Sequence, residues 1–271
     1  VLSADIHAYV HIPYFHWRYF WREQTFLRQG HIKFTKESIS ICELDSKHIA
    51  VLSYKLFHKD AKTFYCREEQ EFPVNFLSIY KVLKECRKGH EIVIGFIEKE
   101  LKDWIVILIE SQGFLSSISW QLYPISSDRI NMGVMEKYRD EMCYSFALPG
   151  YALKRALKII ASQGKEQQWR FDPQKGLIAE FKRKNERTIL TYFKEKQHLQ
   201  DLGKITAQFP IYAVNYISDV NQYYLLDKEK KLRFKMNQVE DLDNGSPLYV
   251  WVDCGEMSKL CFYIAPRIKD E

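Results

Sequence analysis

Lysine and arginine side chains recur at helical spacing in three separate segments of the chain. Within these segments they fall on one side of the expected helix, opposite the apolar residues, and the residues concerned are Arg18 and Arg22; Lys81, Lys84, Arg87 and Lys88; and Lys154, Arg155 and Lys158. Cations gathered on one surface contact phosphate groups without reading a base sequence. One basic helix face is usually only solvated surface, but three of them at equivalent places favour a phosphate-binding surface.

Side chains that could carry catalysis do not form a recognisable set. His7, His11 and His16 straddle an expected change from strand to helix, which does not favour a shared metal ion. His48 lies near Asp45, and an Asp–His pair can orient a catalytic base, but no nucleophile completes the set. A role in a turn is the preferred interpretation of His48.

Sequence motifs of catalytic sites are also missing from the chain. It contains no glycine-rich phosphate loop, no HExxH, no GxSxG and no CxxC pair. The small acidic group of Glu98, Glu100 and Asp103 is more typical of a hairpin turn than of a cation site. We therefore expect no enzymatic activity, no cofactor and no metal ion.

The bulk composition is that of a globular protein. The 271 residues are 46% hydrophobic and 28% charged, with a net charge of +5. The longest apolar run, residues 104–109, is too short to span a bilayer, and the first residues do not resemble a signal peptide. Six cysteines without paired spacing are typical of free thiols in the cytosol or nucleus.

A pattern of one helix, several strands, a second helix and more strands occurs twice in the chain. The helices are expected at residues 13–29, 75–88, 150–163 and 210–220. The strands are expected at residues 31–35, 38–42, 49–56, 91–97, 104–110, 117–123, 142–148, 168–171, 176–181, 188–193, 223–226, 232–236, 248–254 and 260–264. Residues 124–140 show neither period and are interpreted as a connector, so the expected domains are 1–123 and 141–271.

Four short segments, in the correct order along nearly the whole chain, resemble the eukaryotic sliding clamp family of proliferating cell nuclear antigen (PCNA). Residues 43–51, ELDSKHIAV, are similar to the family's loop with Met-Asp-Ser-Ser-His, and residues 78–84, SIYKVLK, to its Ser-Met-Ser-Lys-Ile-Leu-Lys helix. Residues 132–134, MGV, resemble the Leu-Gly-Ile of its connecting loop. The most specific match is the ending FYIAPRIKDE, which is similar to Tyr-Tyr-Leu-Ala-Pro-Lys-Ile-Glu-Asp-Glu.

The resemblance implies an α+β DNA-clamp fold with two similar domains, each with two helices packed on antiparallel sheets. It further implies a homotrimeric ring around duplex DNA that tethers DNA polymerase and other replication and repair proteins without catalysis. Residues 114–123 would then pair with residues 188–193 of a neighbouring subunit. The implied location is the nucleus, or a viral replication site, and a clamp loader is a further possible partner.

The resemblance also implies a groove in which client proteins dock a short motif with aromatic anchors. Carried over position by position, its residues are Leu44, His48, Ile49 and Val51 beneath; Met132 and Val134 from the connector; and Pro247, Tyr263, Ala265 and Pro266 behind. Ordinary packing is the alternative interpretation of each apolar residue taken singly.

The expected fourth helix departs from the family, because Tyr212 and Asp219 stand where the family has basic residues. Unequal subunits can share DNA contacts, so one subunit of a heteromeric checkpoint-type clamp is an alternative. A nucleic-acid-modifying enzyme on an α+β scaffold is a remote third possibility.

Overall fold

The computed structural model describes residues 5–13, 27–45, 48–87, 89–126, 130–140, 142, 144–149, 166–172, 176–183, 186–192, 207–213, 231–236, 247–253 and 256–265. The chain divides into two compact units. The first comprises Val1–His48, Leu52–Ile130 and Asp253–Leu260, and the second Ile49–Val51, Asn131–Val252 and Cys261–Glu271. No helix among the described residues is both long and apolar enough to cross a membrane.

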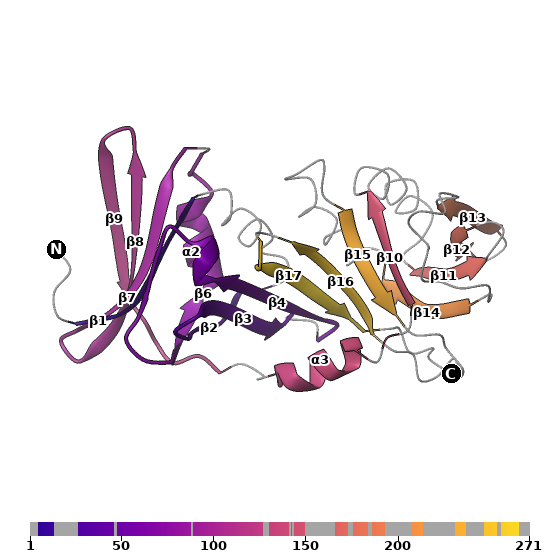
Figure 1. Cartoon of the computed structure of the whole chain (residues 1–271), viewed down its shortest axis with the longest axis horizontal. Coiled ribbons are helices and arrows are strands. Elements are labelled where there is room, and N and C mark those ends of the chain that lie inside the picture. The colour runs from indigo at the N-terminus through magenta and orange to yellow at the C-terminus, as the bar shows by residue number, and fades with distance from the viewer. Residues whose placement is uncertain are drawn as a thin grey trace. The chain divides into compact units, whose positions relative to one another are not determined.

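The first unit contains a five-stranded antiparallel sheet (Figure 1). Its strands are, in spatial order, β5 (Thr63–Cys66), β1 (Ile6–Pro13), β7 (Glu91–Lys99), β8 (Lys102–Ser111) and β9 (Phe114–Gln121). Along β1 the side chains of Ala8, Val10 and Ile12 are buried, whereas Tyr9 and His11 are half-buried. This alternation is the one expected of a strand with one face against a core.

Two tight hairpins connect the last three strands of this sheet. Glu100 and Leu101 have φ values of 56° and 58°, and Gln112 and Gly113 have φ values of 47° and 84°. Two successive residues with positive φ are the signature of the type I′ turn, whose twist matches that of the flanking strands. The expectation of a hairpin turn in the acidic segment is confirmed, because Lys99 pairs with Lys102.

A second layer of strands packs on this sheet in the first unit. It contains β4 (Ala50–Phe57, with its first residues in the second unit), β3 (Ser38–Leu44), β2 (Gln29–Phe34) and β6 (Gln70–Asn75). Phe72 on β6 stacks on Phe96 of β7 at 4.2 Å between ring centroids, and Phe34 meets Phe96 edge-on at 5.6 Å. These aromatic rings join the two layers in one core.

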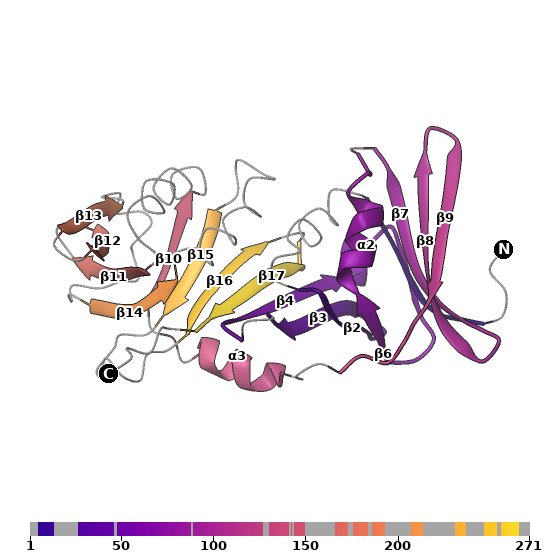
Figure 2. The same ribbon diagram turned by 180° about the vertical axis from the view of Figure 1, so that it is seen from behind.

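The second unit contains two antiparallel groups of strands (Figure 2). One follows the order β10 (Tyr144–Pro149), β15 (Lys231–Met236), β16 (Leu248–Asp253) and β17 (Lys259–Ile264). The other follows β13 (Glu186–Tyr192), β12 (Gly176–Arg183), β11 (Glu166–Asp172) and β14 (Ala207–Ala213). Phe234, Leu248, Val250 and Phe262 are at most 1% exposed and form its described core.

Three expected helices differ from the structure or lie outside it. Most of the first expected helix, residues 14–26, and all of the third, residues 150–163, lie outside the described residues. Pro13, which was expected to begin the first helix, is instead the last residue of β1. The second helix is shorter than expected: α2 spans Phe76–Leu83. Two strands before α2, β5 and β6, were missed, because β5 has only four residues and β6 alternates polar residues with Phe72 and Val74.

The expected helix at residues 210–220 is wrong in its described part. Residues up to 213 belong to β14, where Tyr212 pairs with Gln167 of β11. Pro210 is compatible with this strand because β14 is the last of the described strands in its sheet. Tyr212 therefore does not occupy a helical position, and the loss of a basic residue there does not concern a helix face.

The sequence predicted no regular structure in the connector, but part of it is helical. It contains α3 (Met132–Asp140), preceded by Asn131. The Asn131 side chain accepts the backbone N–H of Gly133 at 2.9 Å, and its carbonyl accepts that of Val134 at 3.1 Å. An asparagine that caps a helix in this way stabilises its first turn.

Candidate nucleic-acid interface and partner surface

Helix α2 carries the described part of the expected phosphate-binding surface. Asn75 caps the helix, since its side-chain oxygen accepts the backbone N–H of Ser78 at 3.0 Å. The buried stripe of the helix is Phe76, Ile79 and Leu83. This packing fixes the opposite side of the helix toward solvent.

Lys81 and Lys84 lie on that exposed side, three residues apart, and Arg87 is exposed just after the helix. The Lys84 ammonium lies 3.5 Å from Glu85 Oε1, but both side chains are largely exposed, so the pair is weak. The described cations of α2 are thus available to an anionic partner. The other candidates, Arg18, Arg22, Lys88, Lys154, Arg155 and Lys158, lie outside the described residues.

The expected partner residues fall into the two units. Leu44 and His48 belong to the first, where Leu44 ends β3 half-buried and His48 is exposed with a φ of 57°. In the second unit the N–H of Ala265 donates to the carbonyl of Ile49 at 2.8 Å, which brings β17 beside the start of β4. Pro247 is half-buried.

Two of the expected partner residues are inside the core of the second unit. Val51 is 6% exposed and Tyr263 only 2% exposed. The Tyr263 ring lies against Tyr249 at 4.7 Å between centroids. By contrast, Val134 on α3 is 47% exposed, and Tyr138, one helical turn later, is 51% exposed. The side chain of Met132 and the whole of Pro266 lie outside the described residues.

Helix α3 is tied to β16 by a polar contact that the sequence did not indicate. The Arg139 guanidinium donates a hydrogen bond to the Tyr249 hydroxyl, which lies 3.1 Å from Cys261 Sγ on β17. Burial, with the neighbouring Cys261, raises the pKa of Tyr249 well above its ordinary value, so the hydroxyl stays neutral. This side-chain contact therefore fixes the helical part of the connector within the second unit.

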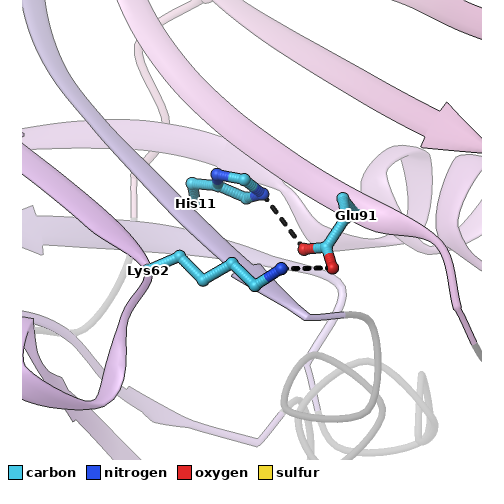
Figure 3. Close-up of polar contacts among 3 residues, drawn as sticks. All are labelled: His11, Lys62 and Glu91. Carbon is cyan, nitrogen blue, oxygen red and sulfur yellow. Dashed lines mark hydrogen bonds and ion pairs between the residues drawn. The ribbon is translucent and has the colours of Figure 1, made fainter.

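Among the described residues, a polar cluster at the five-stranded sheet brings together a histidine, a lysine and a carboxylate (Figure 3). Glu91 Oε2 lies 3.1 Å from His11 Nε2, and Glu91 Oε1 lies 2.5 Å from Lys62 Nζ. The Lys62 hydrogen bond, followed by that of His11, lowers the pKa of Glu91. This carboxylate links β1 and β7 to the loop before β5, which is a structural role.

Of the other two histidines considered for metal binding, His16 lies outside the described residues and His7 has separate partners. His7 Nδ1 accepts a hydrogen bond from the Arg67 guanidinium at 2.8 Å, and its Nε2 lies 3.3 Å from Asp103. No group of three or more metal-ligating side chains occurs in the part of the chain that the structure describes.

Comparison with known proteins shows similarity to proliferating cell nuclear antigen (PCNA) in both sequence and fold. Residues 24–129 match the family model for the N-terminal domain of proliferating cell nuclear antigen. Among solved structures, PCNA from Thermococcus kodakaraensis is 15% identical, with a TM-score of 0.79 over 96% of this chain and 100% of that one. The chain has the DNA-clamp fold of PCNA.

Other structures of PCNA-like chains agree with this fold. The PCNA2–PCNA3 complex from Sulfolobus tokodaii is 14% identical, with a TM-score of 0.76 over 96% of this chain and all of that one. A structure of the C-terminal region of FEN-1 bound to A. fulgidus PCNA is 14% identical, with a TM-score of 0.77 over 97% and 100%. No match to the chain was found among curated proteins. The expected fold class, an α+β clamp fold rich in antiparallel sheet, is confirmed.

Proposed function

We propose that this PCNA-like chain is a processivity clamp that encircles duplex DNA and tethers DNA polymerase and other replication and repair proteins without catalysis. The carrying observation is the clamp fold together with the exposed Lys81 and Lys84 on α2, opposite that helix's buried stripe. Exposed, flexible lysines suit a protein that slides, since each phosphate contact is weak and indifferent to sequence. We place this activity in the nucleus, or at a viral replication site.

The ring would be built from edge strands. Among the described strands, β9 ends the five-stranded sheet of the first unit and β13 ends its sheet in the second unit, so each has one side without a described strand partner. Phe114 and Leu115 on β9 are 79% and 68% exposed, an arrangement that invites pairing with another chain. A contact between two different edges must close into a ring or continue as a filament. A homotrimer satisfies this requirement.

A partner surface at α3 completes the proposal. The likeness to a PCNA with a bound segment of FEN-1 supports it, as do the exposed Val134 and Tyr138. Client proteins, including DNA polymerase, would place an apolar anchor against this helix.

The test combines the mass in solution with retention on DNA. We expect a species of three chains that stays on closed circular duplex DNA and is lost when the DNA is cut, with a clamp loader added if loading requires one.

Replacing Lys81 and Lys84 together by Ala should weaken duplex binding and flatten its salt dependence by about two ions. The matched control is Lys55→Ala, an exposed lysine on β4. A persistent monomer with no assembly on DNA would reject the clamp.

If the chain is instead one subunit of a heteromeric clamp, the pure chain should not have the mass of three chains in solution. The likeness to the PCNA2–PCNA3 complex supports it, whereas its original motive is weakened by the position of Tyr212 in a strand. Self-association of the pure chain into a trimer would rule it out.

A further inference from the structure

Helix α3, which carries the proposed partner surface, meets the rest of the second unit on one narrow side. Among its described side chains, only Met135 and Arg139 are half-buried. The exposed side chains are those of Val134, Glu136, Lys137, Tyr138 and Asp140. A helix of nine residues is not stable by itself in water, so α3 stays folded only where other elements hold it. Met135 and Arg139 are one turn apart and define the side that is held.

Arg139 makes a polar contact from this held side to a strand. Its guanidinium donates a hydrogen bond to the Tyr249 hydroxyl on β16, and its Nε donates to Oδ1 of Asp140 at 2.9 Å. Both views show α3 near one end of β16 (Figures 1 and 2). Asp140 belongs to the same helix, so that bond does not anchor α3. The bond to Tyr249 does, and a charged donor makes it stronger than a bond between neutral groups.

Tyr249 is a rigid acceptor for this bond. It is only 3% exposed, and its ring lies against Trp251 at 5.0 Å and against Tyr263 at 4.7 Å between centroids. Its hydroxyl lies 3.1 Å from Cys261 Sγ, a weak hydrogen-bonding group. Without Arg139 the buried hydroxyl would keep this weak contact and could not turn to water. The geometry therefore favours one position of Arg139, and with it one position of α3.

The sheet depends on this contact less than the helix does. Tyr249 packs against two neighbouring rings whether or not Arg139 is present. Arg139 and Lys235 of β15 both lower the pKa of Asp140, so this exposed carboxylate balances two nearby cations. Loss of the bond between Arg139 and Tyr249 should thus release α3 and leave the strands in place.

We propose that Arg139 is a positioning residue for partner docking: its bond to Tyr249 holds α3 folded against the sheet, so that Val134 and Tyr138 form one exposed apolar stripe. These two residues are four apart, which makes them neighbours on one face only while the segment is helical. A partner that meets the stripe already formed loses less conformational entropy than one that must order it. The inference rests on the proposed partner surface, but it also predicts a property of the chain alone, the folding of α3.

Hydrogen exchange of the full-length chain, followed by mass spectrometry, tests this without any partner, because amide protection reports local opening. Tyr249→Phe removes the hydroxyl and keeps the ring. The amides of α3 should then exchange about tenfold faster, the effect of losing one hydrogen bond to a charged group, while those of β16 and β17 stay protected. The matched control is Tyr138→Phe, the same change at a tyrosine of α3 that is 51% exposed, and it should leave the exchange unchanged.

A second variant separates the bond from any disturbance of the sheet. Arg139→Met removes the guanidinium and keeps most of the length of the side chain, which is 31% exposed. It should accelerate α3 exchange by the same factor as Tyr249→Phe, and the double variant should add nothing further, because both changes break one bond. Unchanged α3 exchange in both single variants would overturn the proposal. So would additive effects, which would mean that the two residues act separately.

Partner binding is measured with a labelled synthetic peptide that carries one leucine and two phenylalanines on one helical turn. Tyr249→Phe should weaken its binding at least about twofold, and at most by the factor for exchange, since the apparent affinity falls with the fraction of chains in which α3 is docked. Equal affinity in this variant and the unmodified chain, together with faster α3 exchange, would overturn the positioning role. Intact peptide binding in Val134→Glu would instead reject the partner surface itself, so the two proposals fail on different measurements.

Discussion

Glu43 occupies the space that a side chain at Gly30 would need. A Cβ atom at Gly30 would lie 2.5 Å from Cδ and 2.6 Å from Oε1 of Glu43. The Glu43 side chain is only 6% exposed, and its Oε1 accepts the backbone N–H of His31 at 2.6 Å. Because this bond holds the carboxylate between β2 and β3, it has little freedom to withdraw. A glycine is therefore needed at position 30 to leave room for the Glu43 side chain of the neighbouring strand β3.

Gly30→Ala should therefore lower the free energy of unfolding by about 1–3 kcal/mol, the usual effect of overpacking. The matched control is Gly95→Ala on β7, where a Cβ would meet Tyr9 Cβ at an ordinary 3.6 Å. Stability should be unchanged or slightly higher in the control, because alanine restricts the unfolded chain. Urea unfolding of both variants provides the measurement, and equal effects would show that Glu43 can move aside.

Asp60 organises the turn between β16 and β17. Its carboxylate accepts the backbone N–H groups of Glu256, Met257 and Ser258 at 3.1, 3.2 and 2.9 Å, together with the buried hydroxyl of Ser258. We expect Asp60→Ala to lower stability by about 2 kcal/mol, because these donors lose a charged acceptor. Asp140→Ala, at an exposed carboxylate, should change the unfolding midpoint little. An unchanged midpoint for Asp60→Ala would contradict the anchoring role.

Stability should fall in acid, partly through Glu91. Its pKa is lowered from the ordinary 4.5 in the folded state, so the folded chain binds fewer protons than the unfolded chain near that pH. The contribution is therefore complete above about pH 4.5 and is lost as the pH falls through the lower folded value.

The variant Glu91→Gln isolates this contribution. It should cost about 0.5 kcal/mol at neutral pH, as for a partly exposed ion pair. The difference from the unmodified chain should disappear once the pH falls below the lowered folded-state pKa of Glu91. Adding Lys62→Ala to Glu91→Gln should cause little further loss. A pH-independent difference would mean that the carboxylate charge is not involved.

The exposed edge of β9 predicts how assembly can be disrupted. Phe114→Glu places a charge on an edge side chain that is 79% exposed and should convert the oligomer to monomers without unfolding. Leu101→Glu is the control, since Leu101 is 92% exposed at the β7–β8 turn, away from the strand edge. Light scattering distinguishes the outcomes, and an intact oligomer in Phe114→Glu would exclude β9 from the interface.

Partner binding should depend on the exposed face of α3. Val134→Glu should weaken binding of a client peptide about tenfold, as for loss of one apolar anchor, and the helix should persist because an acid is favourable near its N-terminus. Tyr263→Ala is a poorer test, because this buried ring packs on Tyr249 and its loss would disturb the core. Glu136→Ala on the same helix is the control, and equal peptide affinity for both variants would place the docking surface elsewhere.

Segments with strong local signals could be predicted from the sequence. The apolar strands β7 and β8 were found because their runs are long and are bounded by polar turns. The buried stripe of α2 and its exposed Lys81 and Lys84 followed from helical spacing. Failure came where the signal was short or ambiguous: β6 is polar on one face, and the run ending at Ala213 was compatible with either period.

The sequence by itself determined the α+β class, most of the strands and the family resemblance, because these depend on side-chain types and their spacing along the chain. Tertiary structure alone decided that Tyr212 pairs in β14, that Tyr263 is buried against Tyr249, and that Arg233 stands opposite Trp251. Each of these depends on pairing between residues far apart in the chain. Local periodicity carries no information about which distant strand supplies the partner, so only the folded register could reveal it.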